Sequence, residues 1–155
     1  MRFFLRGIDP TLFAPWFSLS DDDLRARGAL RRFADSSEGH PCRVSLAEAA
    51  IGEELLLAPY EHHATSSPYR GAGPVYIRRS ATKQVVLDEV PPLLLVRMLS
   101  VRAYDETGMM QHADVVDGRT LAPVLEGLFD RGDVAYVHVH YAKPGCFACV
   151  ATRAK

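Results

Sequence analysis

The most regular pattern of apolar positions lies near the C-terminal end of the chain. Its apolar residues repeat with the i, i+3, i+4, i+7, i+8 spacing of one helical face and are Leu121, Val124, Leu125, Leu128 and Phe129. Thr120 precedes this stripe and Gly132 follows it, which is typical of the two ends of a helix. The pattern predicts an amphipathic helix near residues 120–131 whose apolar face is buried.

Alternating or continuous apolar runs predict the strands. They cover residues 3–8, 54–60, 75–79, 100–105, 109–116, 134–142 and 147–153. Turn residues at 105–108 and at 143–145 leave only a few residues between neighbouring strands, and such tight turns require antiparallel pairing. The sequence therefore predicts an α+β fold with a mostly antiparallel sheet and short helices, formed by residues 1–155 as a single domain.

Capping patterns predict shorter helices elsewhere. Ser20 is typical of a helix start, and the aspartates at 21–23 suit the positive end of that helix rather than a metal site. Residues 45–48, Ser-Leu-Ala-Glu, match a capping box for a helix that ends at residue 52. Residues 61–74, rich in Ser, Thr, Pro and Gly, form the longest predicted loop, and loops of that length often carry function.

Composition narrows the classes of function. Lys and Arg number 18 and Asp and Glu 19, so the net charge is −1 and the basic excess of a nucleic-acid binder is absent. No apolar run is long enough to predict a membrane span, and the apolar N-terminal run is broken early by Arg6. We therefore expect a cytoplasmic protein with no nucleic-acid or membrane partner, whose three cysteines are reduced.

The predicted C-terminal hairpin carries a cluster of Cys and His residues, and the sequence leaves its role open. One reading is a zinc site of His138, His140, Cys146 and Cys149, although cysteines three apart on a strand face opposite sides. A second is a redox pair of the two cysteines. A third follows from a two-residue turn at 144–145, which places His140 opposite Cys149 so that the imidazole activates a nucleophilic, catalytic thiol. The plainest alternative is that the cysteines only fill the core.

A second candidate site lies in the predicted loop at 61–74. Tyr69, Arg70, Gly71 and Gly73 combine exposed backbone N–H groups with an arginine fork, which suits a small anion or carboxylate. Its pocket is predicted to lie between this loop and the face that carries His138 and His140. His62 and His63 are adjacent, so on an extended chain they are expected to point apart and not to share a metal.

Four segments of the chain resemble one known family. They are residues 39–46 (GHPCRVSL), 67–78 (SPYRGAGPVYIR), 99–105 (LSVRAYD), and 137–140 (VHVH) with 145–149 (GCFAC). In this order they are similar to the bacterial family of unknown function that carries the number 1203. Some members have a second cysteine just after the Pro-Cys-Arg segment, where this chain has Val44-Ser45, which argues against a four-cysteine cluster. The resemblance implies a one-domain bacterial protein and no particular activity.

Two classes of function compete on these observations. The first is binding of a small polar or anionic metabolite by Tyr69, Arg70, Gly71, Gly73 and His138. The alternative is a thiol- or metal-dependent enzyme that uses the Cys/His cluster, with His140 and Cys149 as catalytic residues. The sequence assigns no cofactor and leaves open whether Cys42, Cys146 and Cys149 are functional or structural. An interaction module without a pocket, for example a homodimer, is the third option.

Overall fold

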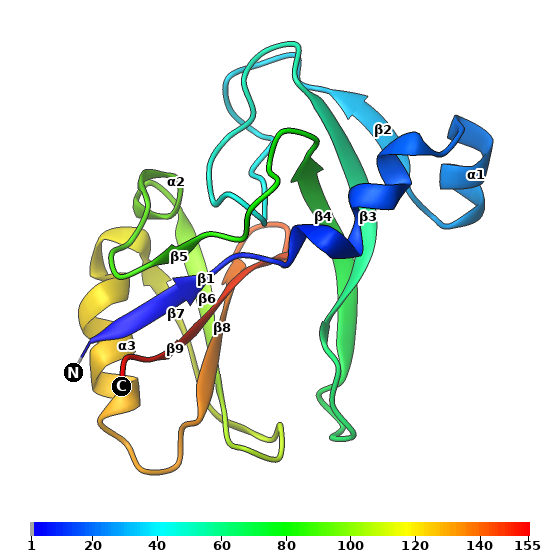
Figure 1. Ribbon diagram of the computed structural model, residues 1–155. Helices are drawn as coiled ribbons and strands as arrows, with labels where there is room; N and C mark the ends of the chain where they lie inside the picture. Colours follow the sequence, from blue (N-terminus) through cyan, green and yellow to red (C-terminus); the bar gives the residue numbers. More distant parts are fainter. Residues whose placement is uncertain (1) are drawn as a thin grey trace.

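The computed structural model describes residues 2–155 as two antiparallel sheets with short helices (Figure 1). The larger sheet has the order β5-β1-β9-β8-β6-β7 and consists of β1 (Phe3–Arg6), β5 (Val86–Leu87), β6 (Met98–Tyr104), β7 (Met110–Asp117), β8 (Tyr136–Tyr141) and β9 (Phe147–Arg153). The smaller sheet has the order β2-β3-β4 and consists of β2 (Leu30–Phe33), β3 (Glu54–His63) and β4 (Gly71–Arg78). All neighbouring strands within the two sheets are antiparallel, which confirms the predicted α+β class.

The helices are short. They are α1 (Asp21–Ala26), α2 (Pro92–Leu95) and α3 (Leu121–Phe129), with 3-10 turns at Pro10–Leu12, Ala14–Ser18 and Gly118–Thr120. Within residues 2–155, no helix has the length and apolar character needed to cross a membrane.

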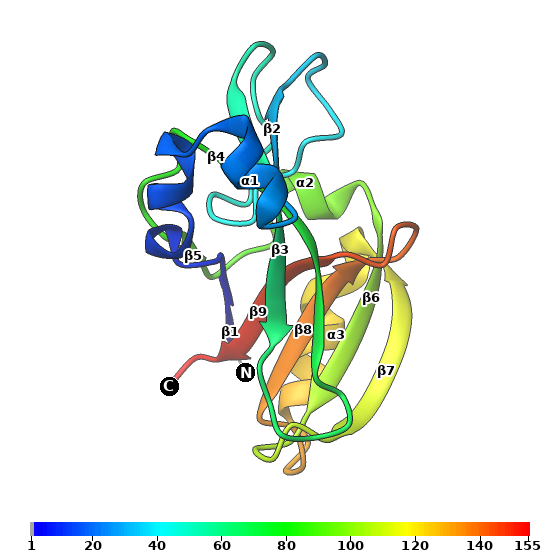
Figure 2. The ribbon, with the colours of Figure 1, turned by 90° about the vertical axis from the view of Figure 1, so that its right-hand side faces the viewer.

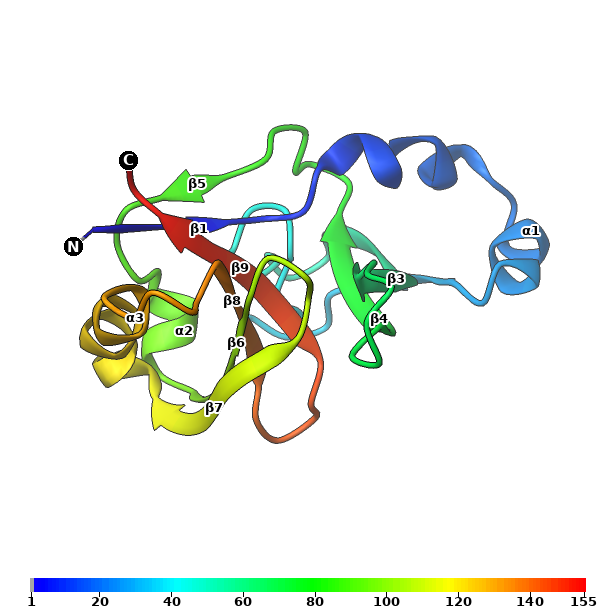
Figure 3. The ribbon, with the colours of Figure 1, turned by 90° about the horizontal axis from the view of Figure 1, so that it is seen from below.

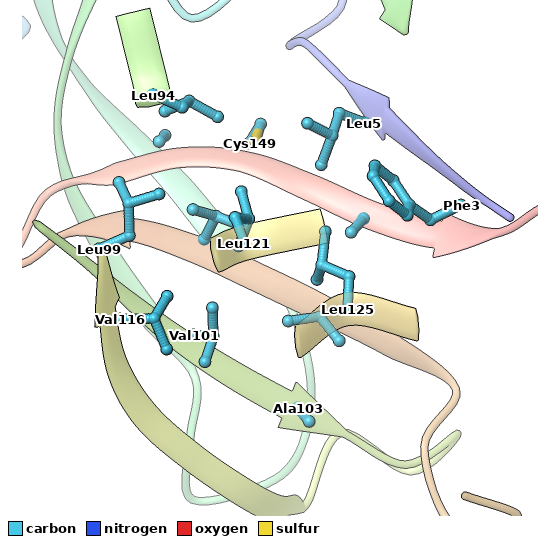
Figure 4. Close-up of a cluster of buried hydrophobic side chains, with 14 of the residues drawn as sticks. Phe3, Leu5, Leu94, Leu99, Val101, Ala103, Val116, Leu121, Leu125 and Cys149 are labelled. Carbon is cyan, nitrogen blue, oxygen red and sulfur yellow. The ribbon is translucent and has the colours of Figure 1, made fainter. Parts of the chain in front are cut away.

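Helix α3 covers one face of the larger sheet and builds the main core (Figure 4). Leu121, Leu125 and Phe129 are fully buried and Val124 is half-buried, so the predicted helix and its buried face are confirmed. These side chains pack against apolar residues that alternate along β6 and β8, because successive strand residues point to opposite faces. The other face of β8 is consequently turned away from α3.

The β3–β4 hairpin lies across that other face. Figures 2 and 3 show β3 and β4 on the side of β8 and β9 opposite to α3, so the larger sheet is sandwiched between them. Phe147 of β9 packs into the core of the smaller sheet beside Leu56 and Ile77. The two sheets are therefore joined through side chains, and the space between β3–β4 and β8 is where polar residues meet.

The predicted helix at residues 45–52 is wrong. This segment is a series of turns in which Leu46 adopts a left-handed backbone with φ of 50°. The capping box fails because the Glu48 carboxylate accepts hydrogen bonds from Arg97 and from the backbone N–H of His40, instead of from the backbone of Ser45. A long-range ion pair thus overrides a local capping pattern.

The predicted loop at residues 61–74 is shorter than expected. Strand β3 continues to His63 and β4 begins at Gly71, so only residues 64–70 connect them. The short strands β2 and β5 were not predicted, because four and two residues carry little periodic signal.

Candidate metal centre

Strand β8 presents a row of polar rings toward the β3–β4 hairpin. Tyr136, His138 and His140 alternate with Val137 and Val139, which join the core on the α3 side. His138 is 4% exposed and His140 is 0% exposed. Two histidines are therefore buried on the face of the sheet that contacts β3.

Strand β3 brings two more histidines to the same place. The His62 ring centroid lies 4.9 Å from that of His140 and 6.0 Å from that of His138. The His63 ring centroid lies 4.9 Å from that of His138. The expectation that His62 and His63 point apart is wrong, because the β3–β4 pairing is irregular between Tyr60 and His63 and a bulge turns both rings toward β8.

Three of these histidines converge. One ring nitrogen from each of His62, His138 and His140 lies within 4.8 Å of the other two. Nitrogens bound at ~2.0–2.1 Å to one tetrahedral Zn²⁺ are about 3.4 Å apart, so closure around an ion needs movements on the order of 1 Å. Each ring also has a buried nitrogen without a hydrogen-bond partner in the described chain: Nδ1 of His62, Nδ1 of His138 and Nε2 of His140.

The backbone fixes the tautomer of His140. Its Nδ1 lies 3.0 Å from the carbonyl oxygen of Gly145, so Nδ1–H donates to that oxygen. In a neutral ring the lone pair is then on Nε2, which is buried and has no hydrogen-bond partner in the described chain. Metal-bound histidines usually hold their second nitrogen in this way.

His63 has a different role. Its Nδ1 donates to the carbonyl of Tyr69 at 2.8 Å, and its Nε2 accepts from the hydroxyl of Tyr136 at 2.7 Å. Both nitrogens are occupied, so His63 holds the hairpin against β8 and does not offer a ligand.

Burial keeps the cluster neutral. Desolvation, followed by the neighbouring histidines, lowers the pKa of His138 from 6.5 to about 3. Desolvation also lowers the pKa of His140 to about 4, against the opposing effect of its bond to Gly145. The pKa of His62 is lowered by burial and then by the charge of Arg102. At neutral pH all three rings therefore carry free lone pairs.

Arg102 supplies a positive charge beside the three rings. It is the cross-strand partner of His138 on β6, so its half-buried side chain shares the same face of the sheet. Its charge lowers the pKa of each of the three cluster histidines. A cation held by the histidines would thus sit next to an arginine, which favours an anion as a further ligand of that cation.

An aromatic ring and a glycine position His62. The Phe147 ring stacks on His62 with an interplanar angle of 5° and a centroid distance of 5.5 Å. On the β4 side, a Cβ added to Gly71 would lie 3.1 Å from Cε1 of His62, which is closer than ordinary contact. Gly71 thus gives His62 the space it occupies.

The expected pair of His140 and Cys149 does not form, and the predicted register is wrong. His140 lies opposite Phe147, and Cys149 lies opposite Val139, with a register shift between them. The turn is longer than two residues, since the Gly145 N–H donates to the carbonyl of Tyr141, and Gly145 adopts a positive φ of 79°.

Cys149 lies in the main core, near Leu5 and Leu94 (Figure 4). Burial raises the pKa of its thiol to about 12, which keeps it protonated at neutral pH. Cys42 is buried in the core of the smaller sheet, and Cys146 is half-buried at the β8–β9 turn. All three thiols are free, and within residues 2–155 none lies in the cluster of His62, His138 and His140.

The residues of the predicted anion loop do not form one site in the structure. Arg70 is exposed and pairs with Glu61, with 2.5 Å between Nε and Oε1, and Gly71 and Gly73 lie within β4. Tyr69 is 40% exposed, and its carbonyl accepts the hydrogen bond from His63. This segment does lie next to the His138 and His140 face, but its contacts there are the Tyr69 carbonyl, which His63 binds, and Gly71, which lies beside His62.

Sequence reasoning missed the role of His62 and of Arg102. Nothing in the alternation of β3 reveals a bulge at its end, and Arg102 shares a face with His138 only through the pairing of β6 with β8. The spacing of His138 and His140 was the usable signal, because residues two apart on a strand share a face.

One comparison with known proteins gives a match. The model of a family described as "Protein of unknown function (DUF1203)" matches residues 39–153. That range includes every histidine of the cluster, Arg102 and the β8–β9 hairpin. No curated protein and no solved structure matches the chain.

Proposed function

The chain belongs to the DUF1203 family, and we propose that it binds one divalent transition-metal ion through His62, His138 and His140. The observation that carries this proposal is the convergence of one ring nitrogen from each of three histidines, each of which also has a buried ring nitrogen without a partner in the described chain. Unpaired buried polar atoms cost about 1–3 kcal/mol each, so a buried unpaired nitrogen on each of three converging rings favours a ligand that pairs them.

The donor set selects the class of ion. Three neutral imidazoles suit Zn²⁺ and its neighbours Cu²⁺, Ni²⁺ and Fe²⁺, whereas Ca²⁺ and Mg²⁺ prefer oxygen ligands. Within residues 2–155 no carboxylate or thiol completes the group, which leaves a position for water or an exogenous ligand. Three protein ligands with an open position are typical of a catalytic rather than a structural zinc site.

The surrounding residues suit an oxygen-bearing, anionic ligand at that position. A bound Zn²⁺ supplies a Lewis acid that lowers the pKa of a coordinated water to about 7. Arg102 adds a positive charge beside the three rings, while the aromatic rings of Phe147, Tyr104 and Tyr136 pack around His138. We therefore infer a metal-dependent function on a small polar or anionic molecule, with Arg102 as the residue that holds its charge.

Metal binding is tested directly on the purified full chain. Zinc is titrated against a chromophoric chelator, and metal content is measured by mass spectrometry. We expect one ion per chain, and His62→Ala, His138→Ala and His140→Ala each to lower the affinity at least about 100-fold. The matched control is His112→Ala, a histidine on β7 that pairs with Asp133 outside the cluster.

Cobalt substitution tests the open position. Addition of azide should change the visible spectrum of the Co²⁺-loaded protein, because an anion enters the coordination sphere. Arg102→Leu should weaken that azide binding while one Co²⁺ remains bound. Unchanged zinc affinity in all three histidine variants would refute the site. A visible spectrum that does not change when azide is added would refute the open position.

A further inference from the structure

A second set of polar groups without partners lies on the opposite face of β8. Tyr141 follows His140 and points toward the α3 side of the sheet, where it is 4% exposed. Its hydroxyl is buried and has no hydrogen-bond partner in the described chain. Burial raises the pKa of this hydroxyl well above its usual value, so it stays protonated and can donate.

The guanidinium of Arg43 lies against the Tyr141 ring. It is 4.9 Å from the ring centroid, and the residue is only 3% exposed. Nε donates to the carbonyl of Phe147 at 2.8 Å and Nη1 to that of Pro41 at 2.6 Å. Among residues 2–155, no carboxylate lies within ion-pair distance of Arg43.

An arginine buried without an acidic partner is costly. Transfer of a charge out of water is repaid only by an opposite charge or by a full set of hydrogen bonds. Two of the five N–H groups of Arg43 are satisfied by backbone carbonyls, and the rest have no acceptor in the described chain. None of its nitrogens is among the fully buried atoms without a partner, so the N–H groups that remain are accessible from outside and can donate to an acceptor with negative charge.

A cavity of about 510 Å³ opens at this point. Its lining includes Arg43, Tyr141 and Arg97, with Lys143 and Pro144 from the β8–β9 turn and Tyr76 from β4. The Arg97 guanidinium also lies over the Tyr141 ring, 5.5 Å from its centroid. The charged residues that line the cavity are thus all basic, while its rings and prolines are apolar.

We propose that this cavity binds a small organic molecule through a carboxylate or phosphate group, held by the Arg43 guanidinium and the Tyr141 hydroxyl. Both oxyanions accept from an arginine fork and a phenol at the same time. The volume matches that of ordinary small-molecule sites, and the apolar lining suits a carbon body behind the oxyanion. The site is separate from the histidine cluster, because Tyr141 and His140 face opposite sides of β8.

The probes are benzoate and phenyl phosphate, with neutral benzamide as the isosteric control, titrated into the full chain by calorimetry. We expect at least one of the two anions to bind ten-fold or more tightly than benzamide. Tyr141→Phe keeps the ring under Arg43 and removes only the hydroxyl. It should weaken anion binding about ten-fold and raise the melting temperature of the ligand-free protein, since it removes an unpaired buried group.

Tyr60→Phe, outside the cavity, is the matched control and should change neither value. Arg43→Gln is a second variant, and ligand binding is judged only if its circular dichroism spectrum is native. Equal binding of benzamide and both anions, or unchanged anion affinity in Tyr141→Phe, overturns the proposal. Binding by one anion alone supports it and identifies which oxyanion the site accepts.

Discussion

The metal-free protein should lose stability as the pH falls from about 6.5 to 5, and the buried histidines set the size of that loss. His138 and His140 have pKa values of about 3 and about 4 in the folded protein, against 6.5 for an unperturbed histidine. In this pH range both histidines bind a proton in the unfolded chain but stay neutral in the folded protein, so acid favours unfolding. The stability that the neutral rings provide is complete above pH 6.5.

The magnitude follows from the two shifts. Each histidine contributes a slope of about 1.4 kcal/mol per pH unit while the pH lies between its folded and unfolded pKa values. From pH 6.5 to 5 the loss is about 2 kcal/mol per histidine and about 4 kcal/mol for both. Domains are stable by about 5–15 kcal/mol, so a loss of this size shifts the unfolding midpoint strongly.

Carboxylates act in a lower pH window and do not obscure the effect. The pKa values of Glu53 and Glu54 are lowered from 4.5 by ion pairs, although burial opposes the shift and is the largest single influence on Glu53. The stability that they contribute is therefore lost only below about pH 4.5.

The assay is urea unfolding between pH 7.5 and 5 with a chelator present, followed by circular dichroism. The double variant His138→Leu/His140→Leu should show a much smaller slope in this range, whatever its stability at pH 7.5, and the slope that remains should come from His62, whose pKa is also lowered by burial. His112→Gln should keep the slope of the natural protein. A flat profile in the natural protein, or an equal slope in the double variant, would contradict the reasoning.

Two pairs of glycine substitutions test the packing. Gly71→Ala should weaken zinc binding about ten-fold or more, because the new Cβ meets His62, whereas Gly73→Ala meets nothing within 4 Å and should leave the affinity unchanged in the same titration. Gly118→Ala should destabilise the protein by about 3 kcal/mol or more in thermal melts, because its Cβ would lie 1.8 Å from the Leu94 carbonyl oxygen. Gly127→Ala, exposed in α3 with open space around it, should stabilise the protein by up to about 1 kcal/mol.

Local patterns predicted those elements whose interactions are themselves local. The stripe from Leu121 to Phe129 requires only that one side of a helix be buried, and the β6–β7 hairpin follows from its own turn at residues 105–108. The failure at residues 45–52 has the opposite cause. The Glu48 carboxylate accepts a hydrogen bond from Arg97, which is 49 positions away in the sequence. A local sequence pattern cannot predict such a contact.

The candidate metal centre was predicted only in part for the same reason. Alternation in β8 placed His138 and His140 on one face, and it pointed to a Cys/His site there. The third candidate ligand is a histidine of β3 and not a cysteine of β9. A bulge in β3 rotates His62 toward the site, and a longer turn shifts the register of β9. Both events change which face a side chain occupies, and a shift of one residue reverses that face.

The two proposed sites share one structural logic, which is that the fold buries polar groups it does not itself satisfy. On one face of β8, three imidazoles converge, and His140 is aligned by the Gly145 carbonyl. On the other face, the Tyr141 hydroxyl is buried without a partner in the described chain, and Tyr141 and an arginine without a carboxylate both line a cavity. Apolar residues at these positions would give a more stable chain. Polar groups kept there at the expense of stability are best explained by ligands that supply the missing partners.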